Sequence, residues 1–262
     1  MPMMAQNIIV FQPEYGVSGD MILSSLIDLL RIDVTAGSKF MTVIEGIAAG
    51  YDETVKIKPQ KIKHEELHGI KLELTWDGGP EWNRTAKGVD IRKEISRCCD
   101  DLQMDFGKKL ALNSIDTIIE AEAKVHGQLP ENVEFHELSS PRILVNLIGV
   151  GYIVENYIDS SWQFCSTPIS LGMGRIKISH GEFKIPPPVT EKILEKFNYK
   201  PAVHYNKGPF SGELATPSGV SLLGNLVHHY FPASPIPVDK YGVGFGSKVF
   251  QSKQSYLRVL QS

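Results

Sequence analysis

The chain has 262 residues, 42% hydrophobic and 22% charged, which excludes disordered, collagen-like and low-complexity classes and predicts one large or two small domains. Because 27 Lys and Arg face 30 Asp and Glu, no global positive charge attracts a phosphate backbone, and a general nucleic-acid binder is excluded. Three cysteines, two adjacent at Cys98 and Cys99, make no disulfide framework, which favours a reducing compartment. The longest apolar run, residues 144–153, is too short to cross a bilayer, so we expect a cytoplasmic protein without membrane span or secretion signal.

The first 76 residues predict a small α+β lobe. Residues 8–11 have the pattern of a buried strand, and a turn then leads to helical apolar spacing in SGDMILSSLIDLL, residues 18–30. A weaker helix is expected over residues 38–47. The runs ETVKIKPQKIK and GIKLELTW alternate with a period of two and predict two strands ending near Trp76.

Residues 77–88 are rich in turn formers and lack periodicity, so they are the expected linker to a second lobe over residues 89–262. That lobe should begin with helices and continue with short strands that alternate with helices near residues 189–197 and 219–230. The predicted fold class is therefore mixed α/β (α+β): a small N-terminal lobe, a helical segment and a mixed lobe. The sequence does not specify the strand order.

Two helices of the second lobe have clear end signals. The helix over residues 108–127 has Gly127 where a C-terminal cap belongs. The helix over residues 139–158 has Ser140 as a possible cap and Pro141 at its first position. Its apolar residues surround the axis, which predicts deep burial.

The string HEELH, from His64 to His68, matches a zinc-peptidase pattern in which one helical turn brings two imidazoles to zinc and the glutamate activates water. Here the string lies between two strand patterns, where a period of two would splay the histidines apart. We therefore interpret it as a coincidence. A zinc peptidase that uses Glu65 is the most distant functional hypothesis.

Imidazoles and carboxylates gather near the end of the first long helix. Glu122 and His126 are four residues apart and should share one helical face, and Glu134, His136 and Glu137 follow within the next eleven residues. This ligand set suits nickel or zinc, and the short connection lets the two clusters meet. The alternative is a histidine that is favourable in a last helical turn without any ligand role.

Two helix starts could hold an anion. In GVSGDM, Ser18 and Gly19 precede a helix whose first turn contains Asp20, a residue that either binds a metal, acts as a base or simply suits a helix start. In GELATPSG, Thr216 could cap a helix with Pro217 at its first position. Capping alone is the simpler interpretation of the second start.

Two further strings have weaker meanings. HGEFKIPPP, which begins at His180, joins a histidine to three rigid prolines and forms either a pocket wall or a surface loop. YGVGFGSK, residues 241–248, spaces its glycines by two, which is not the dinucleotide fingerprint. A close-packed strand is the alternative for this string.

Six strings in the same order resemble the LarC family, the nickel-insertion proteins that complete the nickel-pincer cofactor. Each is weak by itself, but together they span nearly the whole chain. They are GVSGDM (16–21), AEAKVHG (121–127), FHE (135–137), LGMGRIKISHG (171–181), GELATPSG (212–219) and YGVGFG (241–246).

The resemblance implies a cyclometallase that inserts nickel into a pyridinium bis-thiocarboxylate mononucleotide and forms a carbon–nickel bond, with CTP hydrolysed and a second divalent cation assisting. Such chemistry needs a releasing nickel site, an anion pocket and a base for the ring proton. The candidates are Glu122, His126, His136 and His180 as metal ligands, with Glu137 beside them; Ser18, Gly19, Thr216 and Gly219 for the phosphate; and Asp20 or Glu137 as base.

The chain departs from the family pattern in four places. Gln12 stands where the family usually has an aspartate after the first strand, and Arg142 and Asn146 stand where it usually has two aspartates. Arg142 would repel a divalent ion unless it pairs with Glu137 or with a substrate anion. The linker lacks the family's histidines, and the chain ends soon after YGVGFGSK, so the CTP-binding domain with its cation is expected on a separate partner.

These observations leave two main hypotheses. The first is the N-terminal part of a nickel-insertion enzyme, which takes a small mononucleotide and works with a separately supplied CTP-binding domain. The second is a non-catalytic relative that binds a metal or the pincer ligand and has lost catalysis together with its carboxylates.

Overall fold

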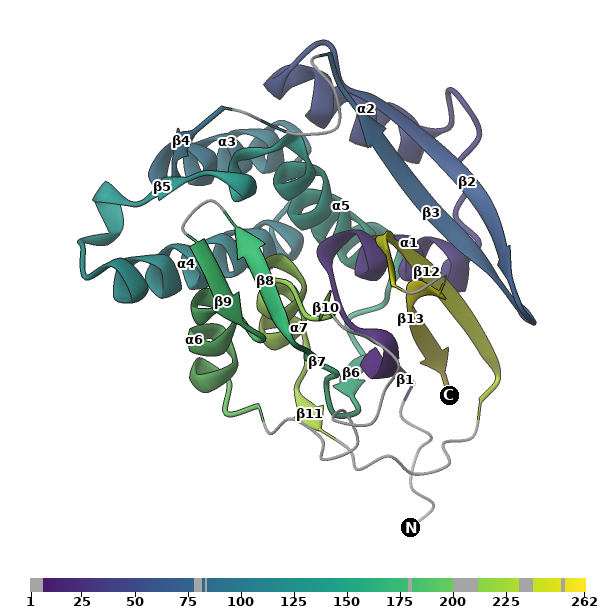
Figure 1. The fold of residues 1–262 in the computed structure, drawn as a ribbon. Coiled ribbons are helices and arrows are strands. Elements are labelled where there is room, and N and C mark those ends of the chain that lie inside the picture. The colour runs from purple at the N-terminus through teal and green to yellow at the C-terminus, as the bar shows by residue number, and fades with distance from the viewer. Residues whose placement is uncertain are drawn as a thin grey trace.

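The computed structural model describes residues 7–77, 82, 84–178, 181–199, 212–230, 238–250 and 253–262. Its main layer is a sheet of seven strands with helices packed against it (Figure 1). In spatial order the strands are β11 (His229–Tyr230), β6 (Gln163–Ser166), β1 (Ile8–Gln12), β13 (Lys253–Gln261), β12 (Lys240–Phe250), β3 (Leu67–Thr75) and β2 (Lys56–His64).

Parallel and antiparallel pairs alternate in blocks across this sheet. β11, β6 and β1 run parallel to one another, as do β12 and β3. The pairs β1 with β13, β13 with β12, and β3 with β2 are antiparallel. The described chain therefore has the mixed α/β fold that the sequence predicts.

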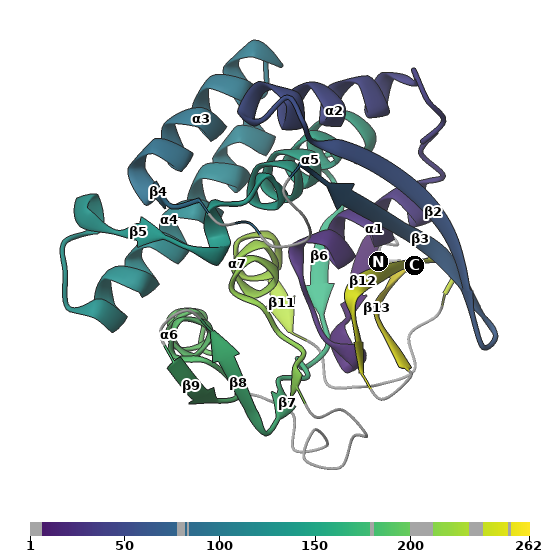
Figure 2. The ribbon, with the colours of Figure 1, turned by 45° about the horizontal axis from the view of Figure 1, so that its top comes forward.

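Most helices form a group around α5, which is buried between its neighbours (Figure 2). α5 contacts α1, α2, α3 and α4, and α4 in turn contacts α6 and α7. The helices are α1 (Gly19–Leu30), α2 (Lys39–Tyr51), α3 (Gly88–Asp101), α4 (Phe106–His126), α5 (Pro141–Tyr157), α6 (Pro188–Lys196) and α7 (Pro217–Leu226).

Helix α1 packs directly on strand β12, and glycines on that strand make the close approach possible. A Cβ atom added at Gly242 would lie 2.2 Å from the backbone nitrogen of Leu29. At Gly244 it would lie 2.1 Å from the carbonyl oxygen of Met21. The glycine-rich string YGVGFG is therefore a close-packed strand, as one reading of the sequence holds.

Small two-stranded units complete the described fold. The hairpin of β8 and β9 lies beside α6 in both views (Figures 1 and 2). The pairs are β8 (Arg175–Ile178) with β9 (Gly181–Lys184), β7 (Gly172–Met173) with β10 (Gly212–Glu213), and β4 (Ala86–Lys87) with β5 (Glu134–Phe135); the short 3-10 helices are Pro13–Tyr15, Pro130–Asn132 and Glu137–Ser139.

Several predicted helix features are confirmed. Gly127 follows α4 in the left-handed conformation at φ 61°, and Pro141 occupies the first position of α5. α5 is buried on all sides from Ile143 to Val154. The helix expected over residues 219–230 is too long, because β11 pairs with β6 instead of continuing α7.

The string HEELH forms the turn of the β2–β3 hairpin. His64 pairs with Leu67, and Lys63 pairs with His68. Because successive strand residues point to opposite faces, the two imidazoles lie on opposite faces of the hairpin. This arrangement rules out the zinc-peptidase geometry, as expected from the sequence.

The sheet joins strands from both expected lobes, since β3 pairs with β12 and β1 pairs with β13. One buried apolar cluster includes side chains from residues 1–76 and from residues 89–262. The linker at residues 77–88 lies partly outside the described residues, and this boundary stays a prediction. Among the described helices, none is long and apolar enough to cross a membrane.

Candidate functional site

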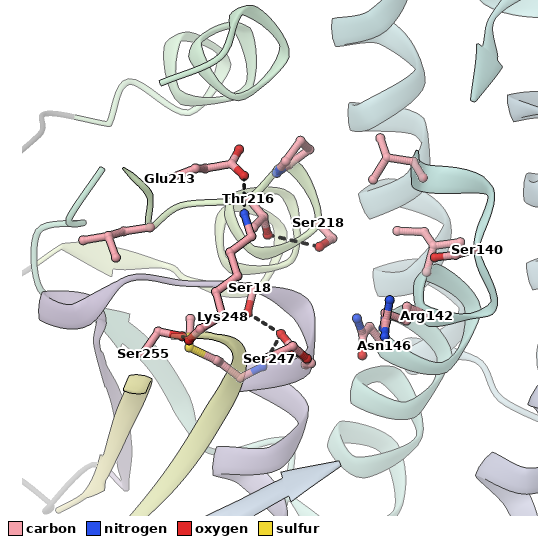
Figure 3. A pocket seen from close by; sticks show the side chains of 16 residues that line it. Ser18, Ser140, Arg142, Asn146, Glu213, Thr216, Ser218, Ser247, Lys248 and Ser255 are labelled. Carbon is pink, nitrogen blue, oxygen red and sulfur yellow. Dashed lines mark hydrogen bonds and ion pairs between the residues drawn. The ribbon is translucent and has the colours of Figure 1, made fainter. Parts of the chain in front are cut away.

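Two adjoining cavities lie where α1, α4, α5 and α7 come together. The first, called the helix-end pocket, has a volume of about 420 Å³ and is lined by Ser18, Asp20, Met21, Leu138, Ser140, Arg142, Ile143, Asn146, Glu213, Leu214, Thr216, Pro217, Ser218, Ser247, Lys248 and Ser255 (Figure 3). The second, called the histidine pocket, has a volume of about 370 Å³ and is lined by Glu122, Val125, His126, Glu134, His136, Leu138, Ile176, Lys177, Phe183, Pro187, Pro188, Val189, Glu213, Pro217 and Lys248. They share four residues, Leu138, Glu213, Pro217 and Lys248.

Three helices begin at the helix-end pocket. Their N-cap residues, Ser18 of α1, Ser140 of α5 and Thr216 of α7, all line it. The first turns of helices have N–H groups without partners inside the helix, and the helix dipole favours negative charge there. Figure 3 shows Ser140 on one wall and Ser18 and Thr216 across from it. The convergence of three helix starts makes the cavity suited to an anion.

At the start of α1, a hydrogen-bond network holds Asp20. Its Oδ1 accepts a hydrogen bond from the Ser18 hydroxyl and another, 3.0 Å long, from the backbone N–H of Met21. Its Oδ2 accepts one from the Ser247 hydroxyl at 3.1 Å. These contacts fit the helix-start reading of Asp20 and also keep its carboxylate at the pocket.

At the start of α7, Thr216 caps the helix as predicted. Its side-chain oxygen accepts a hydrogen bond from the N–H of Gly219 at 3.2 Å, so this N–H already has a partner. The backbone N–H of Thr216 donates to the carbonyl of Val17 at 3.0 Å, which ties α7 to the segment before α1. A Cβ at Gly219 would lie 2.4 Å from that same carbonyl oxygen.

The other predicted glycine, Gly19, has a similar packing role. A Cβ there would lie 2.8 Å from Nδ2 of Asn146 on α5. Gly19 and Gly219 thus let three helices approach one another closely enough to enclose the pocket. Their expected phosphate-binding role stays a prediction.

Arg142 brings a partly buried cation to the first turn of α5. Its Nη2 donates to the carbonyl oxygen of Leu74 at 3.3 Å, and its guanidinium carbon lies 4.6 Å from the ring centre of Trp76. Burial lowers the pKa of the Arg142 guanidinium from its ordinary value, and the nearby charge of Asp20 partly opposes that shift. Asn146 lies one turn further along α5 and lines the same cavity. These two residues bring a positive charge and an amide to the wall of the helix-end pocket that lies across from Ser18, the hydrogen-bond donor to the Asp20 carboxylate (Figure 3).

An ion pair lies at the boundary between the two cavities. Lys248 Nζ is 2.7 Å from Glu213 Oε2 (Figure 3), and both residues line both pockets. The Glu213 side chain is only 9% exposed, whereas that of Lys248 is 48% exposed. Sequence reasoning missed both residues, because each lies inside a glycine-rich string whose chemistry was sought elsewhere.

The structure brings three of the four candidate metal ligands to the histidine pocket. Glu122 and His126 lie on the last turns of α4, with Oε2 and Nε2 3.4 Å apart. His136 follows strand β5 and lines the same cavity. His180, the fourth candidate, lies outside the described residues. The two sequence clusters thus meet, although their roles as ligands stay predictions.

Apolar side chains form much of the histidine pocket's wall. Phe183 of β9, Pro187 and Pro188 line it, which agrees with the pocket-wall reading of HGEFKIPPP. Within the described ranges, no three His, Cys, Asp or Glu side chains are grouped closely enough to hold a metal ion. The imidazoles and carboxylates are therefore near one another without forming a complete ligand cage.

Two further sequence candidates lie apart from these groups or are only partly described. Glu137 lies in the 3-10 helix after His136, and its side chain is outside the description. Gln12 accepts a hydrogen bond from Arg258 Nε at 2.6 Å and lines neither pocket.

The buried thiols are poor nucleophiles, since burial raises the pKa of Cys98 to about 11 and that of Cys99 to about 12.

Comparison with known proteins gives a consistent result. A family model described as "Nickel insertion protein" matches residues 9–262. Three proteins named pyridinium-3,5-bisthiocarboxylic acid mononucleotide nickel insertion protein are similar to this chain. The protein of Staphylococcus saprophyticus is 29% identical, over 90% of this chain and 55% of its own length. The protein of Staphylococcus epidermidis is 31% identical, over 94% of this chain and 57% of its own length, and that of Acetivibrio thermocellus is 29% identical, over 92% of this chain and 57% of its own length.

The chain spans between 55% and 57% of the length of these three relatives. No solved structure matches it.

Proposed function

Because the chain belongs to the nickel insertion protein family, we propose that it binds a pyridinium bis-thiocarboxylate mononucleotide in the helix-end pocket and presents nickel to it from the histidine pocket. The observation that carries this proposal is the shared wall of two chemically different cavities. One suits an anion, and the other contains nitrogen and oxygen ligands. A reaction that joins a metal to an anionic organic ligand needs both sites within reach of one another.

The mononucleotide's charge fits the helix-end pocket. Its phosphate and thiocarboxylate groups are anionic, and the cavity offers three helix starts together with the cations Arg142 and Lys248. Hydroxyl groups complete its lining and can donate hydrogen bonds to phosphate oxygens; they belong to Ser18, Ser140, Thr216, Ser218, Ser247 and Ser255. Arg142 stands where the family pattern has a carboxylate. A carboxylate there could bind a metal ion, whereas in this proposal Arg142 pairs with the anionic substrate.

The side chains of the histidine pocket suit nickel as a transferred substrate. Imidazole nitrogens and carboxylate oxygens are ligands for borderline divalent ions, and an incomplete cage favours release of the ion. Glu122, His126 and His136 would bind nickel on this reading. Insertion replaces a ring C–H bond by a carbon–nickel bond and releases one proton. Asp20, whose carboxylate lines the helix-end pocket, would accept it in this proposal.

In our proposal, the residues of these two pockets do not bind CTP. YGVGFG packs against α1 and is not a nucleotide fingerprint. We assign CTP hydrolysis, and the divalent cation that assists it, to the CTP-binding domain that the family resemblance implies and not to either pocket.

A second candidate function is supported by Arg142 and Asn146. With a cation and an amide at these two positions of α5, the chain could bind the mononucleotide or the finished cofactor without carrying out insertion. It would then be a non-catalytic binding protein of the same family.

Metal analysis tests the nickel site. Purified protein, freed of any affinity tag, should bind one nickel ion. Its affinity should fall at least about tenfold in both His126→Ala and His136→Ala, because each variant removes one proposed ligand. His64→Ala is the matched control, since His64 lies on the β2–β3 hairpin and should leave affinity unchanged. Equal nickel affinity in all four proteins would overturn the site.

Reconstitution separates the two functions. The chain is mixed with nickel, CTP, the mononucleotide precursor and a CTP-binding domain of a family member, and the nickel-containing product is followed by mass spectrometry. Product formation supports insertion. Tight binding of the mononucleotide by calorimetry, without product, supports the binding protein.

A further inference from the structure

The Glu213–Lys248 ion pair joins one fixed partner to one movable partner. Glu213 ends the short strand β10, which pairs with β7, and the next residue donates a backbone hydrogen bond to Leu171 at 3.2 Å. Lys248 belongs to β12, and its carbonyl accepts a hydrogen bond from the Ser255 hydroxyl at 3.0 Å. Its long side chain is half exposed. The ammonium group can therefore turn toward another anion while both backbones stay in place.

Glu213 is the partner that depends on the pair. Its side chain is 9% exposed, and Lys248 supplies the opposite charge that burial requires. A buried carboxylate without a cation or hydrogen-bond donors is costly. When Lys248 turns away, the affinity of the Glu213 carboxylate for any other cation that reaches it rises.

Each cavity offers a replacement for one member of the pair. Lys248 faces the helix-end pocket beside Ser18 and Thr216, where an anion would attract its ammonium group (Figure 3). Glu213 also lines the histidine pocket, where its carboxylate could add a fourth ligand to the incomplete set of Glu122, His126 and His136. The exchange replaces one ion pair by two, an anion with Lys248 and a divalent ion with Glu213.

We propose that this ion pair couples the two pockets, so that an anion bound in the helix-end pocket draws Lys248 away and frees Glu213 to complete the nickel site. The inference rests on the proposed function. It adds an order to that function: nickel is held weakly until the anionic substrate is in place. Because binding linkage is reciprocal, nickel must raise the affinity for the anion by the same factor.

Nickel titration with and without sulfate tests the coupling. Sulfate is a doubly charged oxyanion like the phosphate group, and chloride at equal ionic strength is its control. In the wild-type chain, sulfate should raise nickel affinity about tenfold, within the usual range of coupling between sites. His126→Ala, measured in sulfate, verifies that the titration reports the histidine pocket.

Two variants give opposite results if the ion pair is the link. Lys248→Met frees Glu213 permanently, so nickel should bind about as tightly without sulfate as it binds to the wild-type chain with sulfate. Glu213→Gln removes the released ligand, so nickel should bind weakly in both solutions. Circular dichroism spectra of both variants check that they are folded.

Several outcomes would overturn the coupling. If sulfate still strengthens nickel binding in Lys248→Met, the effect is simple attraction between nearby charges and the ion pair is not the link. If nickel binds the wild-type chain through His126 but is insensitive to sulfate, the coupling is wrong and the proposed function stands. If no nickel binds in either solution, both are wrong.

Discussion

The helix-end pocket and the histidine pocket share a wall but are built in different ways. The first is enclosed by helix starts, backbone hydrogen bonds and glycine contacts, such as that of Gly219 with Val17. The second is enclosed by apolar side chains, with imidazoles at the end of α4 and after β5. In the helix-end pocket, the groups suited to binding also hold the helices together. In the histidine pocket, the groups suited to binding are side chains set in a largely apolar wall, and we do not expect the packing of that wall to depend on them.

This difference predicts where substitutions lower the stability of the fold and where they lower only binding.

The largest effect is expected at Gly219. In Gly219→Ala the new Cβ would lie 2.4 Å from the Val17 carbonyl oxygen and 2.6 Å from the Ser18 Cα, so α7 must move away from α1. We expect the free energy of unfolding in urea to fall by about 2–3 kcal/mol. Gly46→Ala is the matched control in a helix, since no atom lies within 4 Å of the new Cβ there. That variant should gain about 0.5–1 kcal/mol. Equal stability of the two variants would mean that the pocket does not depend on this contact.

An intermediate effect is expected at Arg142, and it concerns binding. Arg142→Met keeps the apolar stem beside Trp76 but removes the charge from the helix-end pocket. We expect the affinity for nicotinate mononucleotide, a pyridinium mononucleotide, to fall about tenfold by calorimetry, or about 1.4 kcal/mol.

The control for that change is Arg175→Met, which removes a surface cation paired with Glu182 on the β8–β9 hairpin. Its affinity should equal that of the wild-type chain. If both variants lose affinity to the same degree, general charge attraction explains the binding and the helix-end pocket has no special part in it.

The smallest effect on stability is expected at His126. This residue lies in the last turn of α4, 3.4 Å from the Glu122 carboxylate, with a side chain that is one-third exposed. His126→Gln should lower the free energy of unfolding by at most about 0.5 kcal/mol, since a helix-end pair of this kind contributes little. A loss of several kcal/mol would show that the imidazole is part of the fold, and the contrast between the pockets would then fail.

The sequence predicts the local parts of the site well. Thr216 and Pro217 show the start of α7, Gly127 shows the end of α4, and the spacing of Glu122 and His126 places them on one face. These features depend on residues within one helical turn. Such contacts are encoded by neighbours in the chain, so a single sequence reveals them.

The parts of the site that sequence reasoning missed depend on contacts between distant segments. The sequence offers Ser140 as a possible cap but not as a pocket residue, because the direction of α5 toward α1 and α7 is set by packing; Ser140 lies at the N-cap position without a side-chain capping hydrogen bond. The strand order, and the ion pair between residues 213 and 248, likewise have no local pattern.

By itself, the sequence determined the types of most elements, the end of α4, the start of α7, the deep burial of α5 and membership in the family. Only the tertiary structure decided that three helix starts face one cavity, that the imidazoles meet in the next, and that Glu213 and Lys248 connect the two. The physical reason is the range of the interactions. Capping and helical periodicity act over three or four residues, whereas the shape and charge of a cavity depend on how elements far apart in the chain pack together.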